Sequence, residues 1–454
     1  MENVTWRLSE FITRLTYDQI TAEAVSKVKS CLLDSLGCAL LGAGTKWGKI
    51  VNGFVQNQSG TPEARLWATR FLGPAANVVL GNGTLIHSFD FDDYHMTKIH
   101  PGSVVIPAAL AIGEKEHADG KMLIAAIVAG YETMIHISRG LNPAASRLKG
   151  WHLTGTCGTF AAAAAMGSIR RFDTKTMASA LGLAGTQSSG LWAFTADGSY
   201  SKRLHPGRAA QSGLIGASLA QMGYHGPTQI LEAEDGGFFE ATSYDFDFSK
   251  VTDGLGEKFD TEEVVIKPYA ACGSLHSTID AALSLRNENQ LRVEDISEIN
   301  VYNSEVVNVQ CGFEYKPMGV LQAQMSLKYC VARTLIDGEL SPAQFSDHKL
   351  SDPQAIELAS HVNFILDEEI NRIYPREFPS IVEIIMKDGT KTMTRVDAPK
   401  GSIMHPMSWT DVQDKFKSIG TQVIGEGQAK ALVESIEELE NVGDVSEISK
   451  LMMV

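Results

Sequence analysis

Apolar residues recur at helical spacing through most of the first half of the chain. The segment 20–43 presents one broad apolar face behind Thr21, a residue type that caps helix N-termini. The same spacing predicts apolar helices over 104–116 and 121–135. Five alanines at 161–165 predict another helix, since alanine has the highest helix propensity. Up to about residue 245 almost no alternating strand pattern occurs, so this part is predicted to be nearly all helical.

The pattern changes after about residue 260. Segment 296–306 alternates like a half-buried strand, and 380–396 reads as two strands joined by a hairpin turn at Lys387-Asp388-Gly389. Helices are predicted between these strands, at 322–336 and from Pro353 onwards. The second part of the chain therefore has α+β composition.

Two local signals predict where secondary-structure elements begin or end. The Asn82-Gly83 pair, which follows small residues from Gly73 onwards, predicts a turn. Near the C-terminus, Thr410 and Gln413 have the spacing of a capping box, which predicts the start of a last helical stretch. We expect this stretch to pack back on the first domain.

Composition narrows the classes of function. The chain has 54 acidic and 39 basic residues, a formal net charge of -15, and no long Lys/Arg block, which argues against a nucleic-acid partner. No run approaches the roughly 18 uninterrupted apolar residues of a membrane span, and the start resembles neither a secretory signal nor a transit peptide. The six cysteines are scattered without a C-x-x-C pair, so we expect a reducing, cytoplasmic location and no metal site.

Ionisable residues gather in four segments, each beside glycine or other small residues. These segments are 90–100, 152–156, 202–208 and 267–276. The first contains so many ionisable residues that it resembles a reaction centre, because buried charge is costly unless it is paired. The alternative interpretation is a solvated polar loop. The second precedes the alanine helix, whose N-terminus suits a carboxylate. The third lies, by its pattern, just ahead of a helix and makes a plausible anion site.

The four segments share the residue types of proton-transfer chemistry on a carboxylate. Histidine has a pKa near neutrality and can remove or deliver protons. Removing a proton from carbon beside a carboxylate creates an enolate-like dianion, which fixed cations stabilise, and Lys202 and Lys267 are the natural candidates. Motifs for nucleotide, nicotinamide, zinc-protease and serine-hydrolase chemistry are absent from the sequence.

Five motifs in order resemble the MmgE/PrpD family, which includes 2-methylcitrate dehydratase, cis-aconitate decarboxylase and iminodisuccinate epimerase. They are LLDSLGCALLG, NGTLIHSFDFDDYH with HPGSVVIPAALA, GWHLTGTCGTFAAAAA, KRLHPGRAAQSG and IKPYAACGSLH. The resemblance implies a mainly α fold with an α+β lid: a helical domain of residues 1–265 and 398–454, and a lid domain of residues 266–397. It also implies a homodimer and a site between the domains that needs no cofactor.

The resemblance also implies which positions form the site. The residues implied as active-site positions are Asp90, His100, His152, Lys202, Lys267, Cys272 and His276. We add Thr154 and Arg203 as substrate-binding candidates, and Tyr94 as a catalytic one. Tyr94 is a departure, because decarboxylase-like members have Thr directly after DFDD.

We therefore expect a lyase acting on a small di- or tricarboxylate, with dehydration of a 2-methylcitrate-like hydroxy acid as the leading hypothesis. One of His100 or His152 acts as the base, Lys202 and Lys267 hold the carboxylates, and Asp90 orients a histidine. A cis-aconitate-type decarboxylase, an epimerase of an amino- or imino-dicarboxylate, and a non-catalytic relative are the alternatives.

Overall fold

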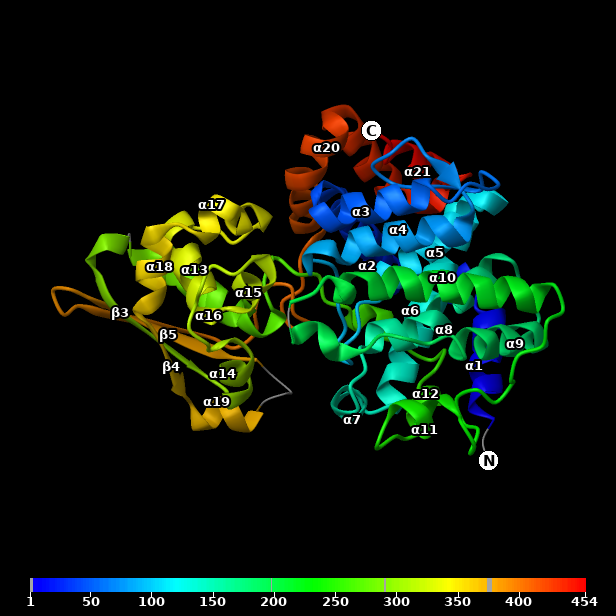
Figure 1. Cartoon of the computed structure of the whole chain (residues 1–454), viewed down its shortest axis with the longest axis horizontal. Coiled ribbons are helices and arrows are strands. Elements are labelled where there is room, and N and C mark those ends of the chain that lie inside the picture. Colours follow the sequence, from blue (N-terminus) through cyan, green and yellow to red (C-terminus); the bar gives the residue numbers. More distant parts are fainter. Residues whose placement is uncertain (1–2, 197, 290, 374–377) are drawn as a thin grey trace. The chain divides into compact units, whose positions relative to one another are not determined.

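The structure is a computed structural model that describes residues 3–196, 198–289, 291–373 and 378–454. The chain divides into two compact units (Figure 1). Unit 1 comprises Met1–Ile266 and Ser408–Val454, and unit 2 comprises Lys267–Met407. The predicted fold class, mainly α with a smaller α+β domain, is confirmed. The expected boundaries at 265/266 and 397/398 compare with 266/267 and 407/408 in the structure.

Unit 1 is built almost entirely of helices. The long ones are α1 (Val4–Arg14), α2 (Ala22–Gly44), α3 (Lys46–Gln56), α4 (Ala75–Ile86), α5 (Gly102–Glu116), α6 (Gly120–Gly140), α8 (Leu153–Ile169), α9 (Thr174–Gly185), α10 (Ser201–Gln221) and α20 (Trp409–Glu437). Shorter ones are α7 (Pro143–Leu148), α11 (Phe238–Thr242), α12 (Ser249–Thr252) and α21 (Ser446–Leu451). Two-residue strands β1 (Ala64–Arg65) and β2 (Leu72–Gly73) pair antiparallel. The predicted cap is confirmed, since the Thr21 side chain accepts a hydrogen bond from the Ala24 backbone N–H at 3.2 Å.

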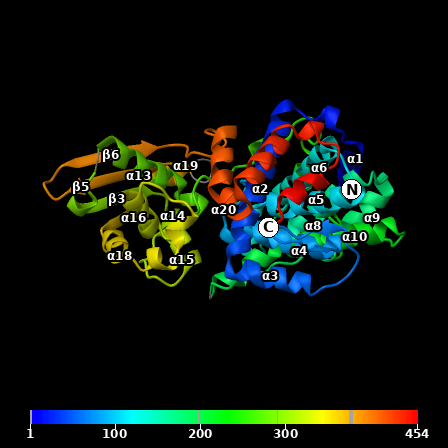
Figure 2. The ribbon, with the colours of Figure 1, turned by 90° about the horizontal axis from the view of Figure 1, so that it is seen from above.

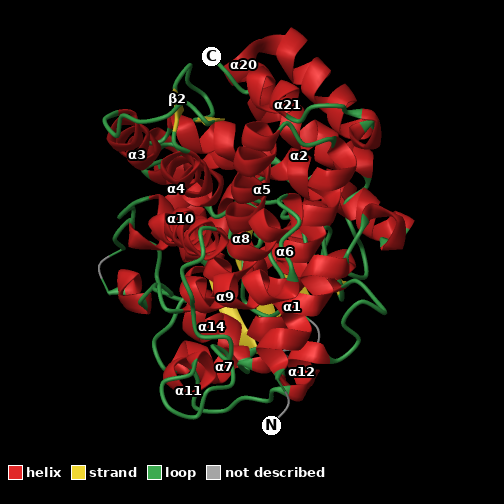
Figure 3. Ribbon diagram, turned by 90° about the vertical axis from the view of Figure 1, so that its right-hand side faces the viewer, coloured by secondary structure: helices red, strands yellow, loops and turns green. Residues whose placement is uncertain are grey.

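Helix α8 forms the centre of unit 1, between α6 and α10 (Figure 3). Its alanines at 161–165 are all fully buried, because small side chains let neighbouring helices approach closely. On α10, a Cβ added at Gly213 would come within 2.4 Å of the Thr159 carbonyl oxygen. The small residues are thus needed for the close packing of α8 and α10.

The prediction of a turn at Asn82-Gly83 is wrong, since both residues lie inside α4. Glycine serves close approach here rather than chain reversal. A Cβ at Gly83 would lie 2.8 Å from the Gly207 Cα on α10 and 2.7 Å from the Ser103 carbonyl oxygen. The pair of glycines lets α4 cross α10 almost backbone to backbone.

The C-terminal segment packs on unit 1 through α20, which lies against α2 (Figure 2). The predicted capping box is two residues out of place. Ser408, rather than Thr410, caps α20, and it exchanges hydrogen bonds with Asp411. Helix α6 has the length and apolarity of a membrane span, but 89% of that window is buried inside the protein, as expected of a core helix.

Unit 2 holds a four-stranded sheet of order β4-β3-β5-β6. Its strands are β3 (Ile296–Asn303), β4 (Val362–Leu366), β5 (Ser380–Met386) and β6 (Lys391–Val396). Strand β3 pairs parallel with β4 and antiparallel with β5, and the predicted β5–β6 hairpin is confirmed. Its helices are α13 (His276–Asn289), α14 (Glu305–Cys311), α15 (Val320–Met325), α16 (Leu327–Asp337), α17 (Asp347–Leu350), α18 (Pro353–Ser360) and α19 (Glu368–Ile373).

The helix predicted over 322–336 is two helices in the structure, α15 and α16. Ser326 separates them in an extended conformation and caps α16, with its side chain accepting from the Tyr329 backbone N–H at 3.2 Å. A serine that can cap a new helix competes with continuation of the old one.

Candidate active site

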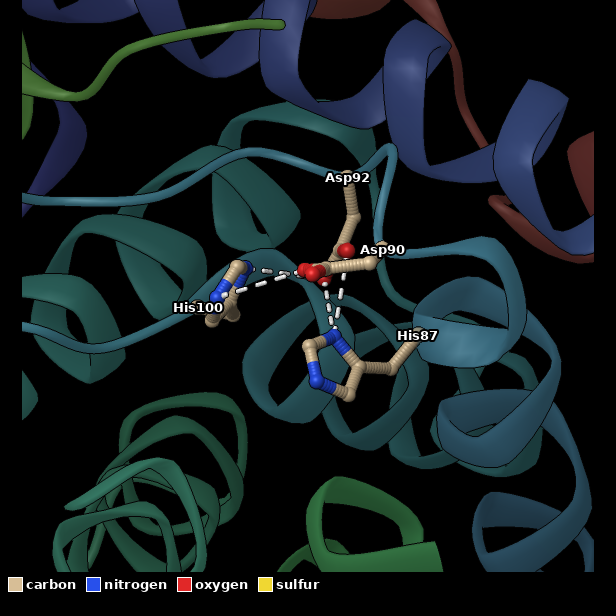
Figure 4. Close-up of side chains that lie close together, drawn as sticks. All are labelled: His87, Asp90, Asp92 and His100. Carbon is tan, nitrogen blue, oxygen red and sulfur yellow. Dashed lines mark hydrogen bonds and ion pairs between the residues drawn. The ribbon is translucent and has the colours of Figure 1, made fainter. Parts of the chain in front are cut away.

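The loop between α4 and α5 turns sharply at Asp90. After α4 a short 3-10 helix, His87–Phe89, ends at Asp90, whose backbone is left-handed at φ 54° and ψ 36°. Aspartate tolerates this conformation better than most residues. Because the chain turns here, the carboxylates of Asp90 and Asp92 come together between the rings of His87 and His100 (Figure 4).

Asp90 joins two predicted site residues. Its Oδ2 lies 2.9 Å from the Lys202 Nζ, and its Oδ1 lies 3.8 Å from the His100 Nε2. The three side chains are 14–16% exposed, so solvent reaches them although they are mostly buried. Lys202 and Arg203 lie in the first turn of α10, and His205 lies at the start of the next turn. The prediction that these residues precede the helix is therefore wrong.

Asp92 forms a fully buried pair with His87. The His87 Nδ1 lies 2.9 Å from the Asp92 Oδ2, and both side chains are 0% exposed. Burial would raise the pKa of Asp92, but the imidazoles of His87 and His100 hold it well below its usual range. Burial lowers the pKa of His87 to about 4, against the attraction of Asp92. His87 is thus a neutral ring that donates from Nδ1 to a charged carboxylate.

Asp93 points to the other side of the loop and fixes the start of α5. Its Oδ2 accepts from the Tyr131 hydroxyl at 2.6 Å, and its Oδ1 accepts from the Gly102 backbone N–H at 2.9 Å. A Cβ at Gly102 would come within 2.6 Å of that Oδ1, so the contact requires glycine. Burial, reinforced by the nearby charges of Asp92 and Asp34, raises the pKa of Asp93 to about 7.

His100 is held in one tautomer. Its backbone N–H donates to the Thr154 Oγ1 at 3.1 Å, and its Nδ1 lies 2.9 Å from the Asp93 carbonyl oxygen. A carbonyl oxygen only accepts, so Nδ1 carries the hydrogen and Nε2 of the neutral ring has a free electron pair. This acceptor faces the carboxylate that binds Lys202. Thr154, predicted to bind substrate, here positions His100.

His152 stands at the N-cap of α8, as predicted, and is 2% exposed. Its ring lies 6.0 Å from the His87 ring, centroid to centroid, and its Nδ1 lies 3.0 Å from the His205 Nδ1. Burial, together with His87 and Lys202, holds the pKa of His152 well below its usual range. At neutral pH this histidine is an uncharged ring that is able to accept a proton.

The remaining candidates of unit 1 border this cluster. Arg203 donates from Nε to the Ser88 carbonyl oxygen at 2.8 Å and stacks on the Trp47 ring at 4.1 Å, so it braces the 3-10 helix. The Tyr94 ring lies 6.4 Å from the His100 ring, and its backbone N–H donates to the Val265 carbonyl at 2.9 Å.

Four donors of the cluster lie close enough to hold a cation. One ligand atom from each of His87, Asp90, Asp92 and His100 falls within 4.8 Å of the others. The two carboxylates already have cationic or N–H partners, since Asp90 binds Lys202 and Asp92 binds His87. Side chains of the protein therefore already provide partners for both carboxylates.

Lys267, Cys272 and His276 belong to the first ten residues of unit 2. Lys267 and His276 are buried, and Cys272 is half-buried. The His276 ring packs edge-on to the Tyr269 ring at 5.4 Å, and the Cys272 backbone N–H donates to the Gln324 carbonyl at 2.9 Å. The predicted residues of the fourth segment thus all belong to unit 2.

Sequence reasoning did not select three side chains of the unit 1 cluster, namely His87, Asp92 and His205. Asp92 belongs to the charge-rich segment 90–100, and His87 precedes this segment by three residues, so a signal was present. The pattern does not say which carboxylate faces inward. His205 follows Lys202 by three residues, which places the two on one face once the helix is known to include them.

Comparisons with known proteins show the family to which this chain belongs. The MmgE/PrpD N-terminal domain model matches residues 6–250, and the C-terminal domain model matches residues 269–441. A cis-aconitate decarboxylase of Aspergillus terreus is 28% identical over 471 residues, covering 99% of this chain and 96% of the relative. The cis-aconitate decarboxylases of Homo sapiens and Mus musculus are 26% and 27% identical, covering 100% of this chain and 95% and 94% of the relatives. Matched along nearly all of its length, the chain belongs to the MmgE/PrpD family.

Proposed function

We propose that the protein is a lyase that acts on a small di- or tricarboxylate by moving a proton at carbon next to a carboxylate. The observation that carries this proposal is the group around Asp90. A lysine ammonium and the Nε2 of a fixed histidine approach the same carboxylate, in a place that solvent reaches. A carboxylate substrate can take the place of Asp90 as partner of Lys202, which brings its neighbouring carbon to His100.

The side chains supply both parts of the chemistry. The His100 Nε2 takes or returns the proton, because its Nδ1 hydrogen is committed to the Asp93 carbonyl. Negative charge that develops on the substrate oxygens is stabilised by Lys202. Neutral His87 and His152 add no competing positive charge to the pocket. The roles of Lys267 and His276 of unit 2 stay predictions from the family resemblance.

Decarboxylation of a cis-aconitate-like acid is the reaction we favour. It is supported by the relatives, which are named cis-aconitate decarboxylases and align over 94–96% of their own lengths. In this reaction the C–C bond to one carboxylate breaks and carbon dioxide leaves. The electron pair stays on carbon as an enolate-like anion beside a second carboxylate, and a histidine then protonates the carbon.

Dehydration of a 2-methylcitrate-like hydroxy acid is the second candidate, and Tyr94 is the observation in its favour. Tyr94 follows the DFDD motif where the family resemblance implies threonine for decarboxylase-like members. Its ring lies 6.4 Å from that of His100. A phenol in this place can protonate a departing hydroxide, a step that decarboxylation does not need.

Proton NMR of the purified protein in deuterated water, with cis-aconitate, citrate, 2-methylcitrate and aspartate-derived acids, tests the proposal. Carbon dioxide release with deuterium in the product supports decarboxylation, and formation of an alkene with loss of water supports dehydration. Exchange of substrate hydrogen alone indicates an epimerase. His100→Gln should abolish the reaction, whereas His117→Gln, at a side chain 76% exposed, should leave it intact. A folded protein that changes none of these acids contradicts the proposal.

A further inference from the structure

His205 makes a direct hydrogen bond to the buried His152. The two Nδ1 atoms lie 3.0 Å apart, and the ring centroids lie 5.2 Å apart. An Nδ1-to-Nδ1 hydrogen bond forms only if one ring carries hydrogen at Nδ1 and the other does not. Within the described parts of the chain, neither ring makes a hydrogen bond to any other group.

The packing around the two rings fixes this contact. The Phe194 ring stands edge-on to both, at 5.7 Å from His152 and 6.0 Å from His205. A Cβ at Gly155 would lie 3.3 Å from the His205 Cβ, so α8 and α10 meet closely at this point. Gly190, with φ at +123°, accepts from the His152 backbone N–H at 2.9 Å. Neither ring can turn without disturbing its neighbours.

Electrostatics limit the pair to at most one extra proton. Two charged imidazoles at 3.0 Å, beside Lys202, would repel each other strongly. Burial and the charge of Lys202 lower the pKa of His205 to about 4, and the pKa of His152 is also held low. Both rings are therefore neutral at rest. The position of the hydrogen on His152, at Nδ1 or at Nε2, decides whether the His152 Nε2 can accept a proton.

We propose that His205 is a positioning residue that sets the tautomer of His152 and takes over its proton during the reaction. At rest His152 donates from Nδ1 to His205, which leaves the His152 Nε2 with a free electron pair. In this proposal His152 shares with His100 the transfer of protons at substrate carbon. When the His152 Nε2 takes a proton from a C–H bond, as in the dehydration and epimerisation alternatives, the electron pair of that bond stays on the substrate. The Nδ1 proton then passes to the His205 Nδ1, so the positive charge rests on half-buried His205 rather than on buried His152.

The reverse transfer returns a proton to carbon, so the same pair serves as base or as acid. This role rests on the proposed function. It assigns to α10 two distinct tasks: Lys202 binds the carboxylate, and His205, three residues later, governs the proton. Because the two residues share one helix face, substrate charge and proton position are set by the same element.

Variants at His205 test the relay by activity. His205→Ala should lower kcat on the order of a hundredfold with little change in KM, and added imidazole should restore part of the loss. His205→Gln keeps a hydrogen-bonding group beside the His152 Nδ1 but cannot take up and release a proton, so its kcat should stay low. Near-normal kcat in His205→Gln would overturn the proposal, since His205 would then only hold the ring. Circular dichroism melting checks that both variants fold.

Nitrogen-15 NMR of the histidine rings tests the pair without turnover. In the wild-type protein we expect one Nδ1 with hydrogen and one without, assigned by loss of signals in His152→Gln and His205→Gln. Hydrogen on Nε2 in both rings would overturn the inference whatever the activity. If no acid of the panel is turned over, the proposed function fails, and the ring signals still decide the state of this pair.

Discussion

A buried cluster in unit 1 predicts a strong dependence of stability on pH. The His136 Nε2 lies 3.1 Å from the Asp260 Oδ2 and 3.4 Å from the Glu132 Oε2, and its Nδ1 lies 2.9 Å from the Val251 carbonyl oxygen. The three ionisable side chains are 0–1% exposed. Burial lowers the pKa of His136, but the nearby carboxylates of Asp260 and Glu132 outweigh it and raise the pKa to about 9. The ring is therefore charged at neutral pH.

The sign of the effect follows from linkage. Unfolded histidine has a pKa near 6.5, so between about pH 6.5 and 9 the folded state binds more protons than the unfolded state. The stabilisation is complete below pH 6.5 and is lost as pH rises through about 9. The shift corresponds to roughly 3 kcal/mol. Arg139, at 2.6 Å from the Asp260 Oδ2, and Lys258, at 3.8 Å from its Oδ1, also pair with Asp260.

The measurement is urea unfolding of the wild type and of His136→Gln, followed by tryptophan fluorescence. All six tryptophans belong to unit 1, so the signal reports on the unit that contains the cluster. Near pH 6 the variant should be less stable by about 3–5 kcal/mol, because buried Glu132 loses its charged partner and buried Asp260 loses one of its three. Near pH 10 this difference should be smaller by about 3 kcal/mol.

His117→Gln is the matched control. His117 also pairs with a carboxylate, Asp444, at 2.9 Å, but its side chain is 76% exposed. Its loss should change the free energy of unfolding by less than about 1 kcal/mol at either pH. An equal difference between wild type and His136→Gln at both pH values would refute the reasoning, since His136 would then be neutral in the folded protein.

Three further changes test the site. Lys202→Met should lower kcat/KM by about a hundredfold or more while unfolding stays close to wild type, because the cation beside Asp90 is lost. The pKa of Asp93 is raised to about 7 in the folded protein. As pH rises from about 4 to 7, the free energy of unfolding of the wild type should therefore fall by roughly 4 kcal/mol relative to that of Asp93→Asn, measured by urea unfolding. Lys415→Met should cost about 3–5 kcal/mol in the same assay, since Asp34, 2.6 Å from the ammonium, is left buried without its charged partner.

Much of the fold could be predicted from the periodicity of apolar residues, but the structural role of a glycine could not. Spacing located α2, α5 and α6, because each buries an apolar face. Asn82-Gly83 was misread, since glycine at a turn and glycine at a helix crossing look alike until the opposing helix is known. At Gly83 the decisive contact is Gly207, more than a hundred residues away in the chain.

The candidate site was predictable in part for a related reason. Density of ionisable groups and ordered motifs indicated Asp90, His100, His152 and Lys202, and the structure brings these four to one cluster. The partners that set their protonation depend on side-chain direction, which the sequence does not contain. His205 could be placed only after α10 was seen to begin at Ser201.

The DFDD motif shows why direction decides function. Three aspartates within four positions have three different environments, because the left-handed backbone at Asp90 sends successive side chains to different partners. Asp92 is charged between two imidazoles, and Asp93 is held by a phenol and a backbone N–H. Both are fully buried, so neither can meet a substrate. Asp90 alone of the three remains partly exposed and binds a lysine. In the proposed function, the substrate carboxylate therefore competes with Asp90 for Lys202.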